Sequence, residues 1–263
     1  MNLYKDKHIF IPLFLVFAAI VSYRAWQDMH PPPRAPHAFF DTYYFVHNDA
    51  MLTPFTTDPE DKRLLVIEAG DIRAGKDGAL ALGAPPVTPI SLPQREIVLV
   101  MSVDAVPKDF ASLGNLLAEA AGKWRDLGDI INDIYIKGPT DKKSLAEMVD
   151  GMNTMRDTMH NDYWLGIFAE EAALKAIPDA RSKLEEAGKS LRTVILNAKN
   201  EQHPDEKIAD LIMRLDKSRE TPFLLQVEAL PDYNALQKAL TSPGPDKFVG
   251  FLVDADKAPK PPQ

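Results

Sequence analysis

The chain has 263 residues, 45% of them hydrophobic and 26% charged, a composition typical of a globular protein with one large domain. Its net charge of -8 and its pI near 5.3 argue against a nucleic-acid partner, because phosphate recognition needs clustered Lys and Arg, which this sequence lacks. The sequence has no cysteine, which excludes disulfides, a thiolate nucleophile and a cysteine-ligated metal.

Residues 1–26 predict a signal anchor that forms a transmembrane helix. Lys5 and Lys7 precede an apolar run from Ile9 to Val21, and the 23 residues from Tyr4 to Trp26, with an aromatic at each end, are enough to cross a bilayer. A cleaved signal peptide and a buried helix are the alternatives, although the candidate cleavage sites are poor. The lysines favour an N-terminus inside, so we predict a single-pass inner-membrane protein with its C-terminal domain in the periplasm.

Residues 27–38 predict a Pro-rich linker, residues 39–256 a barrel-like domain and residues 257–263 a disordered tail. The stretch HPPPRAPHAFF starts at His30 and has four prolines between positions 31 and 36, which fit neither a helix nor a central strand. An extended polyproline II spacer that holds the domain off the membrane is the natural interpretation.

From Phe39 onward the sequence alternates strands with helices. Runs rich in Val, Ile and aromatic residues predict eight strands, in residues 39–49, 63–72, 95–105, 131–141, 163–171, 191–200, 222–230 and 247–256. Apolar residues at steps of three and four predict helices in residues 107–128, 141–159, 178–190, 203–219 and 231–240. The first two crossovers are short and rich in Pro and Gly, so we expect no full helix there.

This alternation predicts an α/β fold with parallel strands and right-handed crossovers. Eight strand units fit a (β/α)8 TIM-barrel-like domain with reduced first helices, preceded by the transmembrane helix. A doubly wound open sheet is the alternative. No Gly-x-Gly-x-x-Gly pattern follows a strand, so a dinucleotide site has no support.

Polar residues gather at the predicted strand ends, where a barrel carries its active site. Converging carboxylates suit sugar chemistry, in which one acid protonates the leaving group and a second acts at the other face. The alternative is that strand ends simply meet solvent and cap the following helices. The strand-end residues are His47, Asn48, Asp49, Glu68, Asp71, Asp104, Asp133, Tyr135, Lys137, Glu170, Glu171, Asn197, Lys199, Glu228 and Asp254.

A strand ending in His-Asn-Asp, the loop APPVTPI, a strand ending in SVDA and the stretch INDIYIKGPTD together resemble a family of uncharacterised bacterial TIM barrels related to glycoside hydrolases. They resemble chitinase-type barrels more distantly. The resemblance implies that Asp104 is the family's strand-three aspartate and that residues 139–140 form its turn. Tyr135 and Lys137 stand where the family has two aspartates, and lysine cannot easily replace a carboxyl proton donor because it keeps its charge unless buried.

The predicted function is that of a membrane-anchored extracytoplasmic barrel, similar to glycoside hydrolases, that acts on or binds an envelope or extracellular polysaccharide with an altered or lost catalytic site. Whether it is an enzyme stays open. The alternative is a non-catalytic envelope scaffold or protein-interaction module with an envelope protein as partner. The predicted catalytic residues are Glu170, Glu228 and Asp104, and the predicted substrate-binding residues are Asp133, Tyr135, Lys137, His47 and Asn197.

No cofactor and no metal site are predicted. The six histidines lack H-x-x-H and HExxH spacing, and no serine lies in a G-x-S-x-G pattern. The methionines of residues 141–159 recur at helical spacing, which fits core packing better than a pliable binding face. An ion pair from Lys137 to Asp104, Asp133 or Glu228 is a structural alternative to a role in binding.

Overall fold

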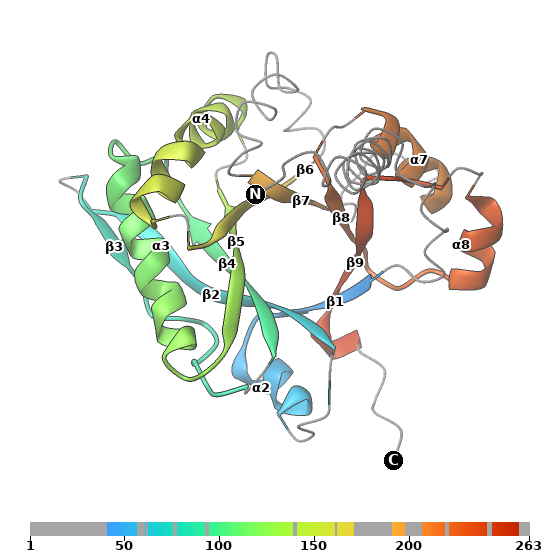
Figure 1. Ribbon diagram of the computed structural model, residues 1–263, viewed down its shortest axis with the longest axis horizontal. Helices are drawn as coiled ribbons and strands as arrows, with labels where there is room; N and C mark the ends of the chain where they lie inside the picture. Colours follow the sequence, from blue (N-terminus) through green and yellow to red (C-terminus); the bar gives the residue numbers. More distant parts are fainter. Residues whose placement is uncertain are drawn as a thin grey trace, which may run out of the picture. The chain divides into compact units, whose positions relative to one another are not determined.

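Parallel strands close into a ring in the computed structural model (Figure 1), which describes residues 41–56, 61, 63–75, 78–92, 95–138, 141–160, 162–170, 191–197, 207–218, 221–240 and 244–257. The ring closes because β1 pairs in parallel with both β2 and β9. Its strands are β1 (Asp41–Val46), β2 (Leu64–Ala74), β4 (Glu96–Val103), β5 (Ile130–Lys137), β6 (Trp164–Glu170), β7 (Leu191–Asn197), β8 (Phe223–Gln226) and β9 (Phe248–Asp254). The predicted parallel, closed α/β barrel is confirmed, and the open sheet is not formed.

The helices lie outside this ring (Figure 1). They are α2 (Asp49–Leu52), α3 (Phe110–Arg125), α4 (Lys142–Thr158), α7 (Ile208–Ser218) and α8 (Tyr233–Ala239), with 3-10 turns η1 (Thr53–Phe55) and η3 (Ala255–Lys257). The described part of the first crossover holds α2 and η1, and the described part of the second holds β3 (Leu80–Leu82), antiparallel to β2, in place of a helix. The first helices are therefore reduced, as predicted. The helix predicted in residues 178–190 lies outside the described residues.

Aspartates begin three of these helices in the same way. Asp109 accepts a hydrogen bond from the backbone N–H of Ala111 at the start of α3, and Asp141 accepts one from Ser144 at the start of α4. Asp232 does the same for the first turn of α8. An acceptor at this position satisfies N–H groups that have no partner inside the helix. The turn from each strand into its helix is thus fixed locally by the sequence.

Period-two alternation along the strands divides the core into an inner and an outer cluster. One face of each strand packs inside the ring, with Phe45, Val66, Val98, Val100, Tyr135, Phe168, Ile195, Leu224 and Leu252. The opposite face packs against the helices, where α4 contributes Leu145, Met148, Val149, Met152 and Met155, followed by Met159. These methionines are buried, as expected for core packing. Strands covered on both faces read as apolar runs, which is why the sequence showed them clearly.

The membrane-anchor prediction concerns residues 1–26, which lie outside the described residues. In the part of the chain that the structure does describe, no helix combines the length and the apolar character needed to cross a bilayer. Residues 39–263 form one compact unit.

Two glycines of α3 provide a matched test of how closely the helices pack. A Cβ on Gly114 would lie 2.7 Å from the carbonyl oxygen of Met155 in α4, whereas a Cβ on Gly122 would have nothing within 4 Å. We expect Gly114→Ala to lower the free energy of unfolding by about 1–3 kcal/mol, because the helices must separate. Gly122→Ala should raise it by about 0.5–1 kcal/mol through helix propensity alone.

Urea unfolding of both variants at 25 °C measures these changes. The substitution and the helix are the same, so their difference isolates the contact between α3 and α4. Equal shifts in the two variants would show that the close approach at Gly114 does not constrain the packing.

Candidate functional site

Each strand of the barrel changes from apolar to polar at its last inward position. Phe45, Val66 and Val100 point into the barrel. Because side chains alternate along a strand, the residues two positions later also point inward, and these are His47, Glu68 and Ser102. The remaining strands follow the same pattern. The resulting ring at the C-terminal mouth is His47, Glu68, Ser102, Lys137, Glu170, Gln226 and Asp254. The predicted Asn197 is the last residue of β7, and its backbone pairs with Glu170 and Gln226.

Five of these residues, from β1, β2, β4, β5 and β9, are joined by polar contacts and are called here the mouth cluster: His47, Glu68, Ser102, Lys137 and Asp254. The imidazole of His47 lies between two carboxylates, with Nδ1 3.0 Å from Oε2 of Glu68 and Nε2 3.4 Å from Oδ1 of Asp254. The other oxygen of Glu68 accepts a hydrogen bond from Oγ of Ser102 at 3.2 Å and faces Nζ of Lys137 at 3.9 Å. Glu68 is therefore the hub of the cluster.

Aromatic rings form the floor of the mouth. The ring of Phe45 lies with its centroid 4.0 Å from that of His47 and 5.7 Å from that of Phe168. Nζ of Lys137 lies 5.6 Å from the centroid of Phe168. An apolar floor beneath the polar ring lowers the local dielectric, which strengthens the interactions among the charges above it.

The contacts shift the protonation of the two central groups in opposite directions. The hydrogen bond that the imidazole donates to Glu68 is the largest influence on His47 and, with a smaller one donated to Asp254, raises the imidazole pKa above its ordinary value despite partial burial. The same hydrogen bond, helped by the charge of Lys137, lowers the pKa of the Glu68 carboxyl. The cluster thus favours an imidazolium beside a carboxylate, each charged form being stabilised by the other.

These shifts predict a pH dependence of stability. The pKa of His47 is raised in the folded state. Its protonation therefore stabilises the fold fully below the pKa of the unfolded chain, near 6.5, and this stabilisation is lost as the pH rises through the pKa of the folded state. We expect the stability difference between the wild type and His47→Gln to shrink over that window. Urea unfolding at pH 5.5 and at pH 9 measures it, and a difference that grows with pH would contradict the assignment.

The predicted row of Asp133, Tyr135 and Lys137 lies on one face of β5, from the middle of the strand to its end. Lys137 lies at the mouth, paired with Glu68 and not with the partners suggested by the sequence. Tyr135 is 3% exposed and belongs to the inner cluster beneath the mouth, and Asp133 lies midway along the strand, with Trp164 as its register partner. Tyr135 therefore supports the floor of the mouth.

The predicted acids occupy different places. Glu170 is the half-buried last residue of β6, pairs with Asn197 of β7, and faces inward at the mouth. Glu228 is exposed after β8, and its backbone carbonyl accepts a hydrogen bond from Lys257. Asp104 is exposed after β4, where its carboxylate accepts a hydrogen bond from the backbone N–H of Ala74. Of the three, Glu170 is the one that shares the inward ring with the mouth cluster.

Three residues of the mouth cluster had no predicted role. Glu68 and Asp254 were among the strand-end residues, and Ser102 was not considered. A signal for them exists in the sequence: each lies two residues after an inward apolar residue, in Val66-x-Glu68, Val100-x-Ser102 and Leu252-x-Asp254. The same rule finds Gln226, which is 5% exposed. Once the inward face of each strand is known, its alternation is therefore sufficient to identify these mouth residues.

A metal centre requires donors that converge on one point. In the mouth cluster the imidazole instead separates the two carboxylates, each bound to a different ring nitrogen. Among the described residues, no group of three or more His, Asp or Glu side chains has an arrangement that could hold an ion.

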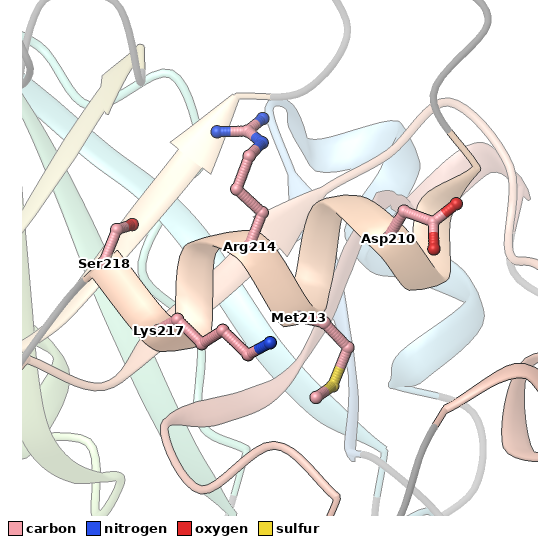
Figure 2. A pocket seen from close by; sticks show the side chains of 5 residues that line it. All are labelled: Asp210, Met213, Arg214, Lys217 and Ser218. Atoms are coloured by element: carbon pink, nitrogen blue, oxygen red, sulfur yellow. The ribbon is translucent and has the colours of Figure 1, made fainter.

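A surface pocket of about 460 Å³ lies on α7, lined by Asp210, Met213, Arg214, Lys217 and Ser218 (Figure 2). The apolar face of the same helix, including Leu211, Ile212 and Leu215, packs in the outer cluster. The pocket is therefore on the outer surface of the helix layer and does not belong to the mouth.

Comparison with known proteins assigns no family to this chain. No protein-family model and no curated protein sequence matches the chain. The solved structure of oxaloacetate acetylhydrolase is 11% identical over 82% of this chain and 76% of that chain, with a TM-score of 0.45. A 2,3-dimethylmalate lyase of the PEP mutase/isocitrate lyase superfamily is 10% identical over 88% and 81%, with a TM-score of 0.43. The putative copper homeostasis protein CutC from Streptococcus agalactiae is 9% identical over 82% and 98%, with a TM-score of 0.44.

Proposed function

We propose that the C-terminal mouth of this barrel binds a hydroxyl-rich ligand, an envelope or extracellular polysaccharide, and does not hydrolyse it. The observation that carries this proposal is the mouth cluster, in which hydrogen-bond donors and acceptors alternate around an imidazole held by two carboxylates. A sugar hydroxyl both donates and accepts, so it matches such a mixed rim.

The charge balance among the described residues of the mouth supports a neutral ligand. With His47 protonated, the mouth cluster carries two cations, His47 and Lys137, against two carboxylates, Glu68 and Asp254. Glu170 adds one further carboxylate to the inward ring. A phosphate or carboxylate ligand would need an excess of positive charge at this rim, whereas a polyol needs none.

The same contacts argue against hydrolysis by Glu68 and Asp254. A glycosidase keeps one carboxyl protonated as a general acid and leaves space between its two acids for the reacting sugar. Here the lowered pKa of Glu68 disfavours proton donation, and the ring of His47 fills the space between Glu68 and Asp254. An altered site that binds without cleaving is consistent with both features.

Binding of the full-length chain to a panel of envelope polysaccharides and exopolysaccharides, with product analysis in the same samples, tests the proposal. We expect binding without new reducing ends. Asp254→Asn should weaken binding, and Glu119→Gln, at an exposed position on the outer helix α3, is the control. Products that disappear in Glu170→Gln would instead make this a hydrolase, and absence of binding to every polysaccharide would favour the non-catalytic scaffold.

We also propose that residues 4–26 anchor the chain in the inner membrane, with the barrel in the periplasm. The apolar run from Ile9 to Val21, the preceding lysines and the proline-rich linker support this placement. Separation of inner and outer membranes, followed by protease digestion of spheroplasts, tests it. The expected result is inner-membrane fractionation with the barrel accessible from outside, and a protein protected in intact spheroplasts would contradict the orientation.

A further inference from the structure

Three large apolar side chains stand out on the surface of the described residues, and they gather at the N-terminal end of the barrel. Leu127, Ile130 and Trp164 are 40%, 46% and 38% exposed, and they are called here the basal patch. Ile130 and Trp164 are the first residues of the neighbouring strands β5 and β6, and Leu127 lies in the turn that leads from α3 into β5. Parallel strands begin at the same rim, so the basal patch lies at the end opposite the mouth.

Arginines accompany the aromatic residues of this rim. The guanidinium of Arg156 lies 3.9 Å from the ring centroid of Trp164. That of Arg125 lies 5.8 Å from the ring of Tyr163 and is paired with Asp162 at 3.7 Å. An amphipathic indole beside an arginine is the combination that proteins place at the level of lipid headgroups, where the ring contacts acyl chains and the cation meets phosphate.

The chain enters the barrel at this same rim. β1 begins at Asp41, whose register partner is Gly250 near the start of β9. The residues before it are the proline-rich linker and the apolar segment, both outside the described residues. The rim that carries the basal patch is therefore also the one at which β1 begins, and the mouth lies at the opposite rim.

We propose that the basal patch docks on the surface of the bilayer in which the chain is anchored, so that the mouth faces away from the membrane. This inference rests on the proposed membrane anchor. Three apolar side chains bind a bilayer weakly by themselves, but a covalent anchor keeps them at high effective concentration beside it. The chain has a net charge of -8 and Arg125 is already paired with Asp162, so insertion of the apolar groups dominates over attraction to anionic lipid.

The three tryptophans of the chain make the proposal directly measurable. Trp26 ends the predicted anchor, Trp124 is buried in α3, and Trp164 belongs to the basal patch. The full-length chain is reconstituted in phosphatidylcholine vesicles with and without phospholipid brominated near the headgroup. In the Trp26→Phe variant we expect bromolipid to remove roughly half of the Trp164 emission, because an interfacial side chain sits at that depth. The Trp26→Phe, Trp164→Phe double variant leaves only Trp124 and gives the baseline.

Two further measurements test which residues and which forces make the contact. Ile130→Glu should reduce the quenching of Trp164, whereas Met213→Glu, on the outer pocket of α7, should not. The quenching should persist in 0.5 M salt, which screens a purely electrostatic contact. Loss of the quenching in salt would overturn insertion as its cause.

Emission of Trp26 distinguishes failure of this proposal from failure of the anchor. Quenching of Trp26 in the Trp164→Phe variant without quenching of Trp164 would overturn the docking and leave the anchor standing. If the basal patch then proved to mediate self-association by analytical ultracentrifugation, its occupant would be a second copy. Chains that do not float with the vesicles at all would overturn both.

Discussion

Phe45→Ala is expected to lower the free energy of unfolding by about 3–5 kcal/mol, the range for deleting a buried aromatic side chain. Phe45 is 1% exposed inside the barrel, where its ring packs against Phe168 with centroids 5.7 Å apart and lies beneath His47. The other buried residues of the inner cluster belong to seven different strands, so they cannot collapse into the space without distorting the ring. Chemical denaturation monitored by circular dichroism at constant pH measures the loss.

Phe45→Leu is the matched control, because it keeps an apolar side chain and leaves a much smaller cavity. We expect it to lower stability by less than about 1.5 kcal/mol. A loss below about 1 kcal/mol in Phe45→Ala itself would show that the barrel interior is not packed as the inner cluster indicates. A loss in Phe45→Leu as large as that in Phe45→Ala would point to the aromatic contact with His47 rather than to the cavity.

The fold could be predicted from sequence because its signal is repeated and local. Eight apolar runs, aspartates at helix starts such as Asp109 and Asp232, and methionines at helical spacing in α4 each report a feature that the neighbouring residues determine. Closure of the ring was harder to predict from the sequence. It depends on the pairing of β1 with β9, two strands at opposite ends of the domain, which no local pattern encodes.

The candidate site was only partly predictable for a similar reason. Choosing polar residues at strand ends found His47 and Lys137 but gave equal weight to Asp104 and Glu228, which the structure places outside the mouth cluster. Inward and outward positions differ by a single residue along a strand, so the end of the strand must be known to that accuracy. Glu68 shows the difficulty: β2 continues beyond it to Ala74, so the inward end of its barrel segment does not coincide with the end of the strand.

Glu68→Gln should be the most informative change at the mouth, since Glu68 contacts three other members of the mouth cluster. Glutamine keeps the shape of the side chain and removes its charge. We expect the pKa of His47 to fall toward its ordinary value, because the hydrogen bond that its ring donates to the Glu68 carboxylate is the main cause of its elevation. Titration of the His47 ring protons by NMR measures this, with His47→Gln used for assignment.

The same variant links the electrostatics of the mouth to binding. Loss of a charge-assisted hydrogen bond in a partly buried site weakens the interactions of its partners, so affinity for the polysaccharide bound by the wild type should fall roughly tenfold or more. Glu119→Gln makes the same chemical change at an exposed position on the outer helix α3 and should leave both the His47 titration and the affinity unchanged. A lowered His47 pKa with unchanged affinity would separate the two and place the ligand elsewhere on the barrel. A parallel loss of both would identify the imidazolium held between Glu68 and Asp254 as part of the recognition surface.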